Sequence, residues 1–64
     1  MDKKLFNKAL DAMNEYMTVQ GAYIFDSPTE EFSSMDQKYV YLANWSTTFG
    51  KYEKASGAFI PDKK

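Results

Sequence analysis

Hydrophobic and polar residues recur along the first part of the chain with the spacing of one helical face. Between residues 3 and 20, apolar side chains follow one another at three- and four-residue intervals, with lysines and acids between them. This apolar set is Leu5, Phe6, Ala9, Leu10, Met13, Tyr16 and Met17. Asp2 suits the N-cap, and Gly21 follows the last periodic residue, where a left-handed glycine commonly ends a helix. The pattern predicts an amphipathic helix over about 3–20.

The pattern changes after this helix. Residues 21–25, GAYIF, form a short apolar run that is either a buried strand or an extended link. Polar and acidic residues then dominate 26–37, which we interpret as an acidic linker. Within the linker, the sequence SPTE at 27–30 is typical of a capping box, which predicts a turn or two of helix over about 28–33.

The second half of the chain has two interpretations. A helix over 36–55 would place four aromatic residues on one face, but it would carry Gly50 and a run of Ser and Thr in its interior, where helix propensity is poor. Strands suit the residue types better, because 38–43 is rich in β-branched and aromatic residues that alternate between two faces. The four aromatics are Tyr41, Trp45, Phe49 and Tyr52. An all-α protein of two or three helices stays open as the alternative.

The strand interpretation predicts a small antiparallel meander over about 38–60. Its parts are a strand at 38–43 covered on both faces, a turn at 44–48, a charged edge strand at 49–55, a short strand at 58–60 and a frayed tail at 61–64. We therefore expect a single domain of the α+β class over residues 1–64, in which the N-terminal helix packs on the meander.

The composition indicates a folded chain with little surplus core. It has 64 residues, of which 44% are hydrophobic and 17% aromatic, too many for a disordered segment. A chain of this length buries only ~60% of the surface that its unfolded form exposes. We therefore expect most of the large aromatics of 38–54 to pack beneath the helix, with Trp45, in the predicted turn, as the exception.

The residue types argue against an enzyme or a metal protein. The chain has neither cysteine nor histidine, so it lacks disulfides, the usual zinc ligands and the commonest general base. The acidic linker lacks the oxygen-ligand spacing of a calcium loop. We expect no catalytic residue, no cofactor and no metal. No apolar run is long enough to span a membrane, so we also expect a soluble cytoplasmic protein without a membrane partner.

Our leading hypothesis is a small non-enzymatic protein-interaction module. It would act by contact, as an accessory or inhibitor protein of a bacterium or phage does, and the origin rests on base rates alone. The contact residues that we predict are Asp26, Glu30, Glu31, Asp36 and Trp45, because the acids lie in one linker and tryptophan is enriched at binding hot spots.

The alternative is a weak binder of single-stranded nucleic acid that uses one face of the sheet. Its residues would be Lys38, Tyr39, Tyr41, Lys51, Tyr52 and Lys54, with rings that stack on bases and lysines that follow the backbone. All eight cations are lysine, so the bidentate phosphate contacts of arginine are absent, which disfavours this reading. A homodimer is a third hypothesis, because a small core and an unprotected strand edge are both relieved by a second copy.

Overall fold

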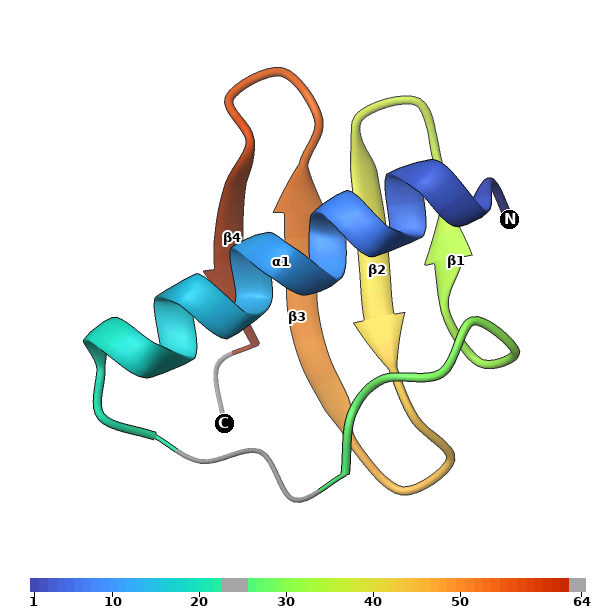
Figure 1. Cartoon of the computed structure of the whole chain (residues 1–64). Helices are drawn as coiled ribbons and strands as arrows, with labels where there is room; N and C mark the ends of the chain where they lie inside the picture. Colours follow the sequence, from blue (N-terminus) through green and yellow to red (C-terminus); the bar gives the residue numbers. More distant parts are fainter. Residues whose placement is uncertain (23–25, 63–64) are drawn as a thin grey trace.

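One helix lies across one face of a four-stranded antiparallel sheet in the computed structural model, which describes residues 1–22 and 26–62 (Figure 1). The elements are α1 (Lys3–Val19), β1 (Ser34–Met35), β2 (Tyr39–Ala43), β3 (Thr48–Glu53) and β4 (Ala58–Pro61). The strands stand side by side in chain order, β1-β2-β3-β4. The predicted α+β class and meander are confirmed, and the helical interpretation of residues 36–55 is wrong.

Both ends of α1 form as the sequence predicts. The Asp2 side chain accepts a 2.9 Å hydrogen bond from the amide of Lys4, which satisfies one of the free N–H groups of the first turn. At the other end, Gly21 has a φ of 72°, and the amide of Ala22 donates to the carbonyl of Met17 at 2.8 Å. A left-handed glycine therefore reverses the chain directly after Gln20, the C-cap.

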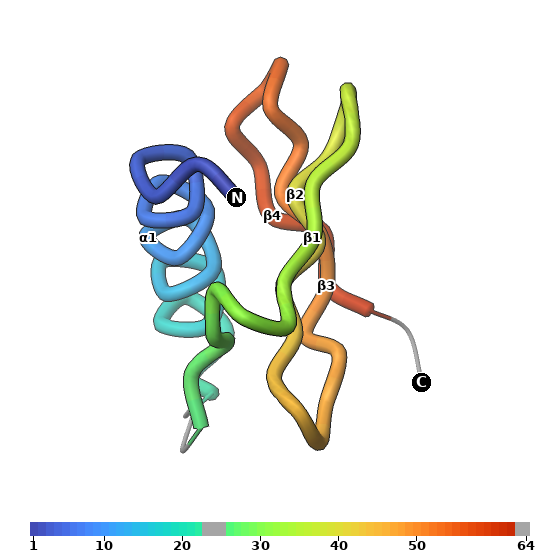
Figure 2. Tube along the Cα trace, turned by 90° about the vertical axis from the view of Figure 1, so that its right-hand side faces the viewer, coloured from blue at the N-terminus to red at the C-terminus, as the bar shows by residue number. Residues whose placement is uncertain are grey.

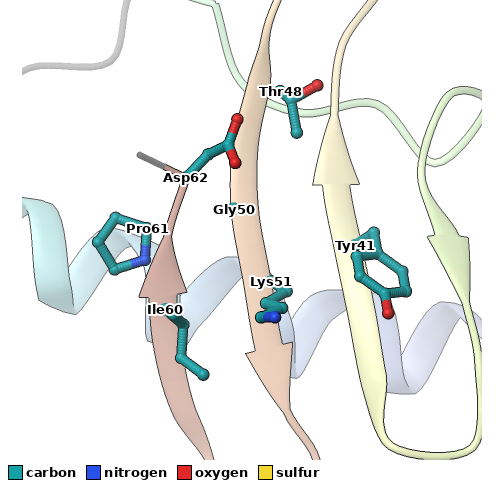
Figure 3. Close-up of a pocket in the computed structure, with 7 residues that line it drawn as sticks. All are labelled: Tyr41, Thr48, Gly50, Lys51, Ile60, Pro61 and Asp62. Atoms are coloured by element: carbon teal, nitrogen blue, oxygen red, sulfur yellow. The ribbon is translucent and has the colours of Figure 1, made fainter. Parts of the chain in front are cut away.

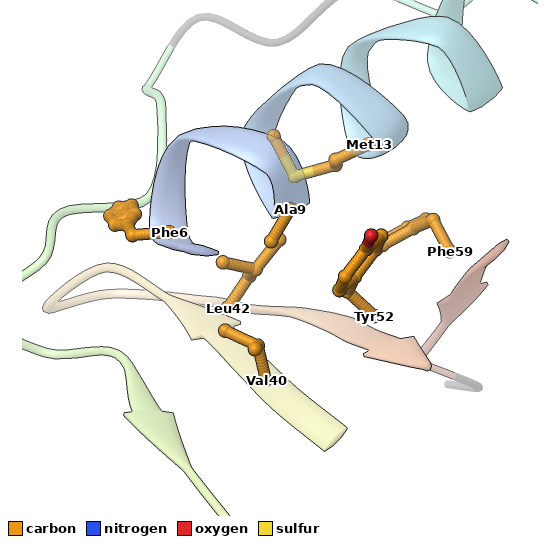
Figure 4. Packing of buried hydrophobic residues seen from close by; sticks show 7 residues of the cluster. All are labelled: Phe6, Ala9, Met13, Val40, Leu42, Tyr52 and Phe59. Atoms are coloured by element: carbon orange, nitrogen blue, oxygen red, sulfur yellow. The ribbon is translucent and has the colours of Figure 1, made fainter. Parts of the chain in front are cut away.

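The hydrophobic core lies between α1 and the inner face of the sheet (Figure 4). Its buried residues are Phe6, Ala9 and Met13 from α1, Val40 and Leu42 from β2, Tyr52 from β3 and Phe59 from β4. The ring of Tyr16 extends this cluster by packing at 5.6 Å, centroid to centroid, on the ring of Phe59. One helix thus contacts the three longer strands, and its periodic face is buried by them.

A bulge and a glycine shape β3. Leu42 lies opposite Gly50, but Ala43 lies opposite Thr48, so Phe49 is the extra residue in β3. A Cβ on Gly50 would stand 2.4 Å from the carbonyl oxygen of Ile60 and 2.7 Å from a ring carbon of Phe59. The φ of Gly50, 151°, is also one that side chains disfavour. Only glycine fits at this point, because β4 and the core ring approach the backbone too closely.

Two details of the predicted meander are wrong. We expected residues 49–55 to be an edge strand, but β3 lies between β2 and β4. We expected β2 to be covered on both faces, but α1 packs on one side of the sheet (Figure 2). Val40 and Leu42 are buried in the core on that side. On the other side Tyr39 and Tyr41 stay half-buried, because no described element forms a second layer over them.

The predicted tail begins too early. Pro61 is the last residue of β4, and the amide of Asp62 donates to the carbonyl of Phe49 at 3.0 Å. Hydrogen-bonded pairs recur at every second residue of an antiparallel ladder, so Pro61 stands opposite Gly50 at a position without such bonds. The missing N–H of Pro61 therefore faces away from β3, which is why the strand tolerates proline there.

The acidic linker has less helix and more sheet than its sequence predicts. The amides of Phe32 and Ser33 donate to the carbonyl of Thr29, so the predicted helix over 28–33 is a single turn. The two-residue strand β1, which we did not predict, follows this turn and pairs with β2, with Ser34 opposite Tyr41. The prediction for residues 21–25 falls on positions 23–25, which lie outside the described residues.

Candidate functional site

The turn between β2 and β3 presents Trp45 to solvent. The carboxamide oxygen of Asn44 accepts hydrogen bonds from the amides of Ser46 and Thr47, at 2.9 and 2.7 Å, and from the Ser46 hydroxyl at 3.1 Å. The amide of Asn44 donates to the carbonyl of Thr47, which closes the turn. Asn44 is itself buried, whereas the Trp45 side chain is 81% exposed. A turn that is ordered by hydrogen bonds therefore carries an indole ring that does not pack in the hydrophobic core.

The turn at Thr29–Ser33 is fastened to the same end of β2. The amide of Thr29 donates to the carbonyl of Ala43 at 3.2 Å, and the Ser33 hydroxyl bonds both the amide and the carbonyl of Ala43. This turn carries two of the predicted acids and an aromatic ring, which is 49% exposed. We refer to Glu30, Glu31, Phe32 and Trp45 as the Trp45 end, because both turns adjoin the last residue of β2.

Asp36 does not belong to the Trp45 end. It lies in the turn between β1 and β2, which precedes β2, whereas Trp45 follows it. Its Oδ1 accepts hydrogen bonds from the amides of Lys38 and Tyr39, and its Oδ2 accepts a 2.6 Å bond from the Tyr41 hydroxyl. The structure thus divides the predicted contact residues between the two ends of one strand. Asp26 is an exposed linker residue that no hydrogen bond described here ties to either end.

The bonds of Asp36 change two pKa values in opposite directions. The Tyr41 hydroxyl, followed by the amides of Tyr39 and Lys38, holds the pKa of the Asp36 carboxyl below its ordinary value of 3.8. The same bond raises the pKa of Tyr41 above 10.0, because the Asp36 carboxylate disfavours a second negative charge beside it. The pair thus holds the β1–β2 turn against the strand that follows it.

Three of the six residues of the predicted nucleic-acid face lie on the side of the sheet that α1 leaves uncovered. Tyr41 on β2, Lys51 on β3 and Ile60 on β4 stand in one cross-strand row, and Tyr39, two residues before Tyr41, lies on the same face of β2. We call Tyr39, Tyr41, Lys51 and Ile60 the open face. Tyr52 does not share this face: it lies opposite Val40, points towards α1 and is only 8% exposed, so its inclusion in the predicted set is corrected.

The rings of the open face are already engaged. The Lys51 ammonium lies 4.5 Å from the centroid of the Tyr39 ring, and that of Lys38 lies 5.6 Å from the same centroid. The Tyr39 and Tyr41 rings are tilted by 55° rather than parallel. Lys54, also in the predicted set, donates from its ammonium to the Asp36 carbonyl. These contacts keep the three lysine ammonium groups close to the protein surface. Tyr39 and Tyr41 do not form a parallel pair of rings on which bases could stack.

An open depression of about 410 Å³ lies beside these residues, between β2 and β4 (Figure 3). Its walls include the Tyr41 ring, the Lys51 stem and the side chain of Ile60, and Asp62 stands at its rim. Sequence reasoning missed Ile60 as a surface residue, although its alternation with the buried Phe59 was a usable signal. Among residues 1–22 and 26–62, no three acidic side chains gather as a metal site requires.

Comparison with known proteins assigns no family. No protein-family model matches the chain, and neither a curated protein nor a solved structure is significantly similar to it. The described part of the chain holds no helix that is long and apolar enough to cross a membrane. Function must therefore be argued from the Trp45 end and the open face themselves.

Proposed function

We propose that this protein is a small interaction module that binds a partner protein through the Trp45 end. The observation that carries the proposal is the 81% exposure of Trp45 on a turn fixed by the hydrogen bonds of Asn44. An exposed indole does not contribute to the stability of the fold, whereas a tryptophan that becomes buried on binding is among the strongest anchors in protein interfaces. A turn that is already ordered also loses little conformational entropy when it binds.

The charge around Trp45 indicates the kind of partner. Glu30 and Glu31 lie on the neighbouring turn, and Phe32 on the same turn adds a second exposed ring. An interface of this composition fits an apolar pocket with a basic rim on the partner, because complementary charge orients the encounter and the ring supplies the buried area. Binding of this kind needs no catalytic group or cofactor, and the module would act by covering the partner's surface.

The test is a comparison of matched variants in an affinity capture from cell lysate at moderate salt, with and without nuclease. Trp45→Ala should lose a stoichiometric partner protein that the wild type retains after nuclease treatment. Met35→Ala is the control, because Met35 is an exposed apolar residue on β1, outside the Trp45 end. If the Trp45→Ala and wild-type proteins, both folded by circular dichroism, capture the same proteins, the proposal is wrong.

A second candidate function is binding of single-stranded nucleic acid by the open face. Its support is that Tyr39, Tyr41 and Lys51 share one uncovered surface. The contact of Lys51 with Tyr39 and the Asp36 carboxylate beside Tyr41 both oppose base stacking and phosphate binding there. Phosphate binding weakens steeply with salt, so fluorescence anisotropy with a labelled oligonucleotide at rising salt distinguishes this candidate from the first.

A further inference from the structure

Among the strands that the structure describes, none pairs with the outer edge of β4. β4 is the last strand of the order and is bonded on its inner side to β3. The amide of Asp62 donates to the carbonyl of Phe49, so these two residues form a hydrogen-bonded pair of the β3–β4 ladder. Bonded and non-bonded pairs alternate along such a ladder, so Ile60 and Lys51 form a bonded pair, whereas Phe59 and Tyr52 form a non-bonded pair. The N–H and C=O groups of Phe59 therefore point outwards, where a further strand would lie.

The helix extends beyond this edge. In Figure 1 the last turns of α1 project past β4, with no strand drawn beneath them. A groove of about 260 Å³ runs between this part of the helix and the edge, lined by Ala12, Tyr16 and Val19 on one side and Ala58 and Phe59 on the other. Val19 is 77% exposed, so the apolar face of α1 continues past the sheet that buries the rest of it.

On the side away from α1, a strand at this edge would lie next to Ile60, whose other side borders the depression over β3. The depression of the open face reaches Ile60 and Pro61 of β4, on the side away from α1. Side chains of a strand point alternately to the two faces of a sheet and advance ~3.3 Å per residue. A strand laid beside β4 would thus place one residue in the groove under α1 and the next beside Ile60.

We propose that the β4 edge binds an extended segment of a partner protein as a fifth strand. Apolar side chains of the segment enter the groove under α1, and their polar neighbours lie towards the open face. The depression is lined by both Lys51 and Asp62, so the charge preference comes from Glu15, which lines the groove. The segment that fits therefore carries Lys or Arg beside the apolar residue that enters the groove. This is recognition by strand addition, with main-chain bonds to Phe59 and pocket contacts for selectivity.

A second copy of the chain fits this edge less well than a partner segment. Symmetric antiparallel pairing centred on Phe59 would set Pro61 of one copy against Gly57 of the other. Pro61 has no N–H to give, and the Gly57 amide already donates to the carbonyl of Glu53 at 2.8 Å. Only the reciprocal bonds of Phe59 remain in that dimer, whereas an unrelated strand can also donate to the outward carbonyl of Pro61.

The experiment is selection of displayed random peptides of about ten residues, long enough for one strand with flanks, on the full chain. Selected peptides should alternate apolar and polar residues and be enriched in Lys and Arg. A synthesised example should slow hydrogen exchange of the Phe59 amide. Glu15→Lys should weaken its affinity about threefold, as expected for one surface charge contact, while Glu31→Lys, the same charge change at the Trp45 end, should leave it unchanged.

Three results would overturn the proposal. The first is recovery of no peptide with the alternating pattern. The second is a peptide whose binding protects Tyr39 or Tyr41 and leaves the Phe59 amide exchanging freely. The third is protection of the Phe59 amide that rises with the concentration of the protein alone, which would assign the edge to a second copy. Trp45→Ala should keep full peptide affinity, so failure here and failure of the Trp45 proposal are separate outcomes.

Discussion

The hydroxyl of Tyr41 donates a 2.6 Å hydrogen bond to the carboxylate of Asp36, and this bond joins the acidic linker to the centre of the sheet. Tyr41 stands on β2, with β1 on one side and β3 on the other. The Asp36 carboxylate also accepts the two amides that begin the turn into β2, so one side chain organises both the turn and the short strand before it.

Removal of the Tyr41 hydroxyl should raise the pKa of Asp36. In Tyr41→Phe the largest cause of the lowered pKa is gone, so the value should move towards 3.8, while Tyr39→Phe should not move it, because Tyr39 contributes through its amide. Carbon-13 NMR titration of the Asp36 carboxyl measures both. A value unchanged in Tyr41→Phe would mean that the hydrogen bond does not persist in solution.

The same bonds predict the sign of a pH effect on stability. The folded-state pKa of Asp36 is depressed, so its contribution is complete above the unfolded-state pKa near 3.8 and is lost as pH falls through the lower folded value. Urea unfolding at a series of acidic pH values should show a decline in the free energy of unfolding below about pH 4. Asp36→Asn should remove part of that decline, and an identical decline in both proteins would contradict the assignment.

Gly50→Ala should be strongly destabilising. The new methyl group would overlap the Ile60 carbonyl at 2.4 Å and the Phe59 ring at 2.7 Å, so β4 and a core ring would both have to shift. We expect a loss of about 3 kcal/mol in the free energy of unfolding. Gly21→Ala is the control: its φ is also positive, but nothing lies within 4 Å, so the loss should be only ~1 kcal/mol. Equal losses would show that β4 does not approach β3 so closely.

Met13→Ala should leave a cavity at the centre of the core. Met13 is fully buried on the face of α1 that packs on the sheet, and replacement by alanine should cost about 3 kcal/mol in the free energy of unfolding. Met35→Ala is the matched control, because Met35 is 41% exposed on β1 and its loss should cost less than ~1 kcal/mol. Thermal and urea unfolding followed by circular dichroism measure both. A similar cost for the two variants would contradict the placement of the core.

Asn44→Ala should loosen the turn that carries Trp45. The carboxamide oxygen of Asn44 accepts three hydrogen bonds in a buried position, and its removal should cost about 2 kcal/mol. Ser46→Ala removes only the hydroxyl contribution and should cost less than half as much. Unfolding experiments measure the cost, and the fluorescence anisotropy decay of Trp45 should show faster local motion in Asn44→Ala alone. An equally rigid indole in that variant would mean that other contacts order the turn.

The parts of the fold that were predictable are those set by local sequence. The spacing of Phe6, Ala9 and Met13 places the helix, and Asp2 and Gly21 mark its ends through their own backbone preferences. The alternation in β2 and β4 separates Val40 and Phe59 from the outward residues. These signals need no knowledge of distant partners, which is why the helix and the meander could be read from the chain.

What the sequence could not supply depends on contacts between distant residues. The two-residue strand β1 exists because Ser34 and Met35 meet β2, and its own residues have no β pattern. The position of Tyr52 under the helix follows from pairing with Val40. For the candidate site, the exposure of Trp45 could be expected from its turn, whereas the attachment of Asp36 to Tyr41 could not, because it depends on where β1 lies.

Because the strands follow one another in chain order, every pairing in the sheet joins neighbours in sequence, and a segment from Ser34 to Pro61 contains all of them. Among the described elements, the packing of α1 on the strands is what joins residues far apart in the sequence, so helix docking carries most of the loop-closure entropy of folding. We therefore expect the helix to detach before the sheet melts, and slow amide exchange to be strongest in β2 and β3. A strand bound in the groove beside β4 would contact both α1 and the sheet, and its binding would oppose the detachment of the helix.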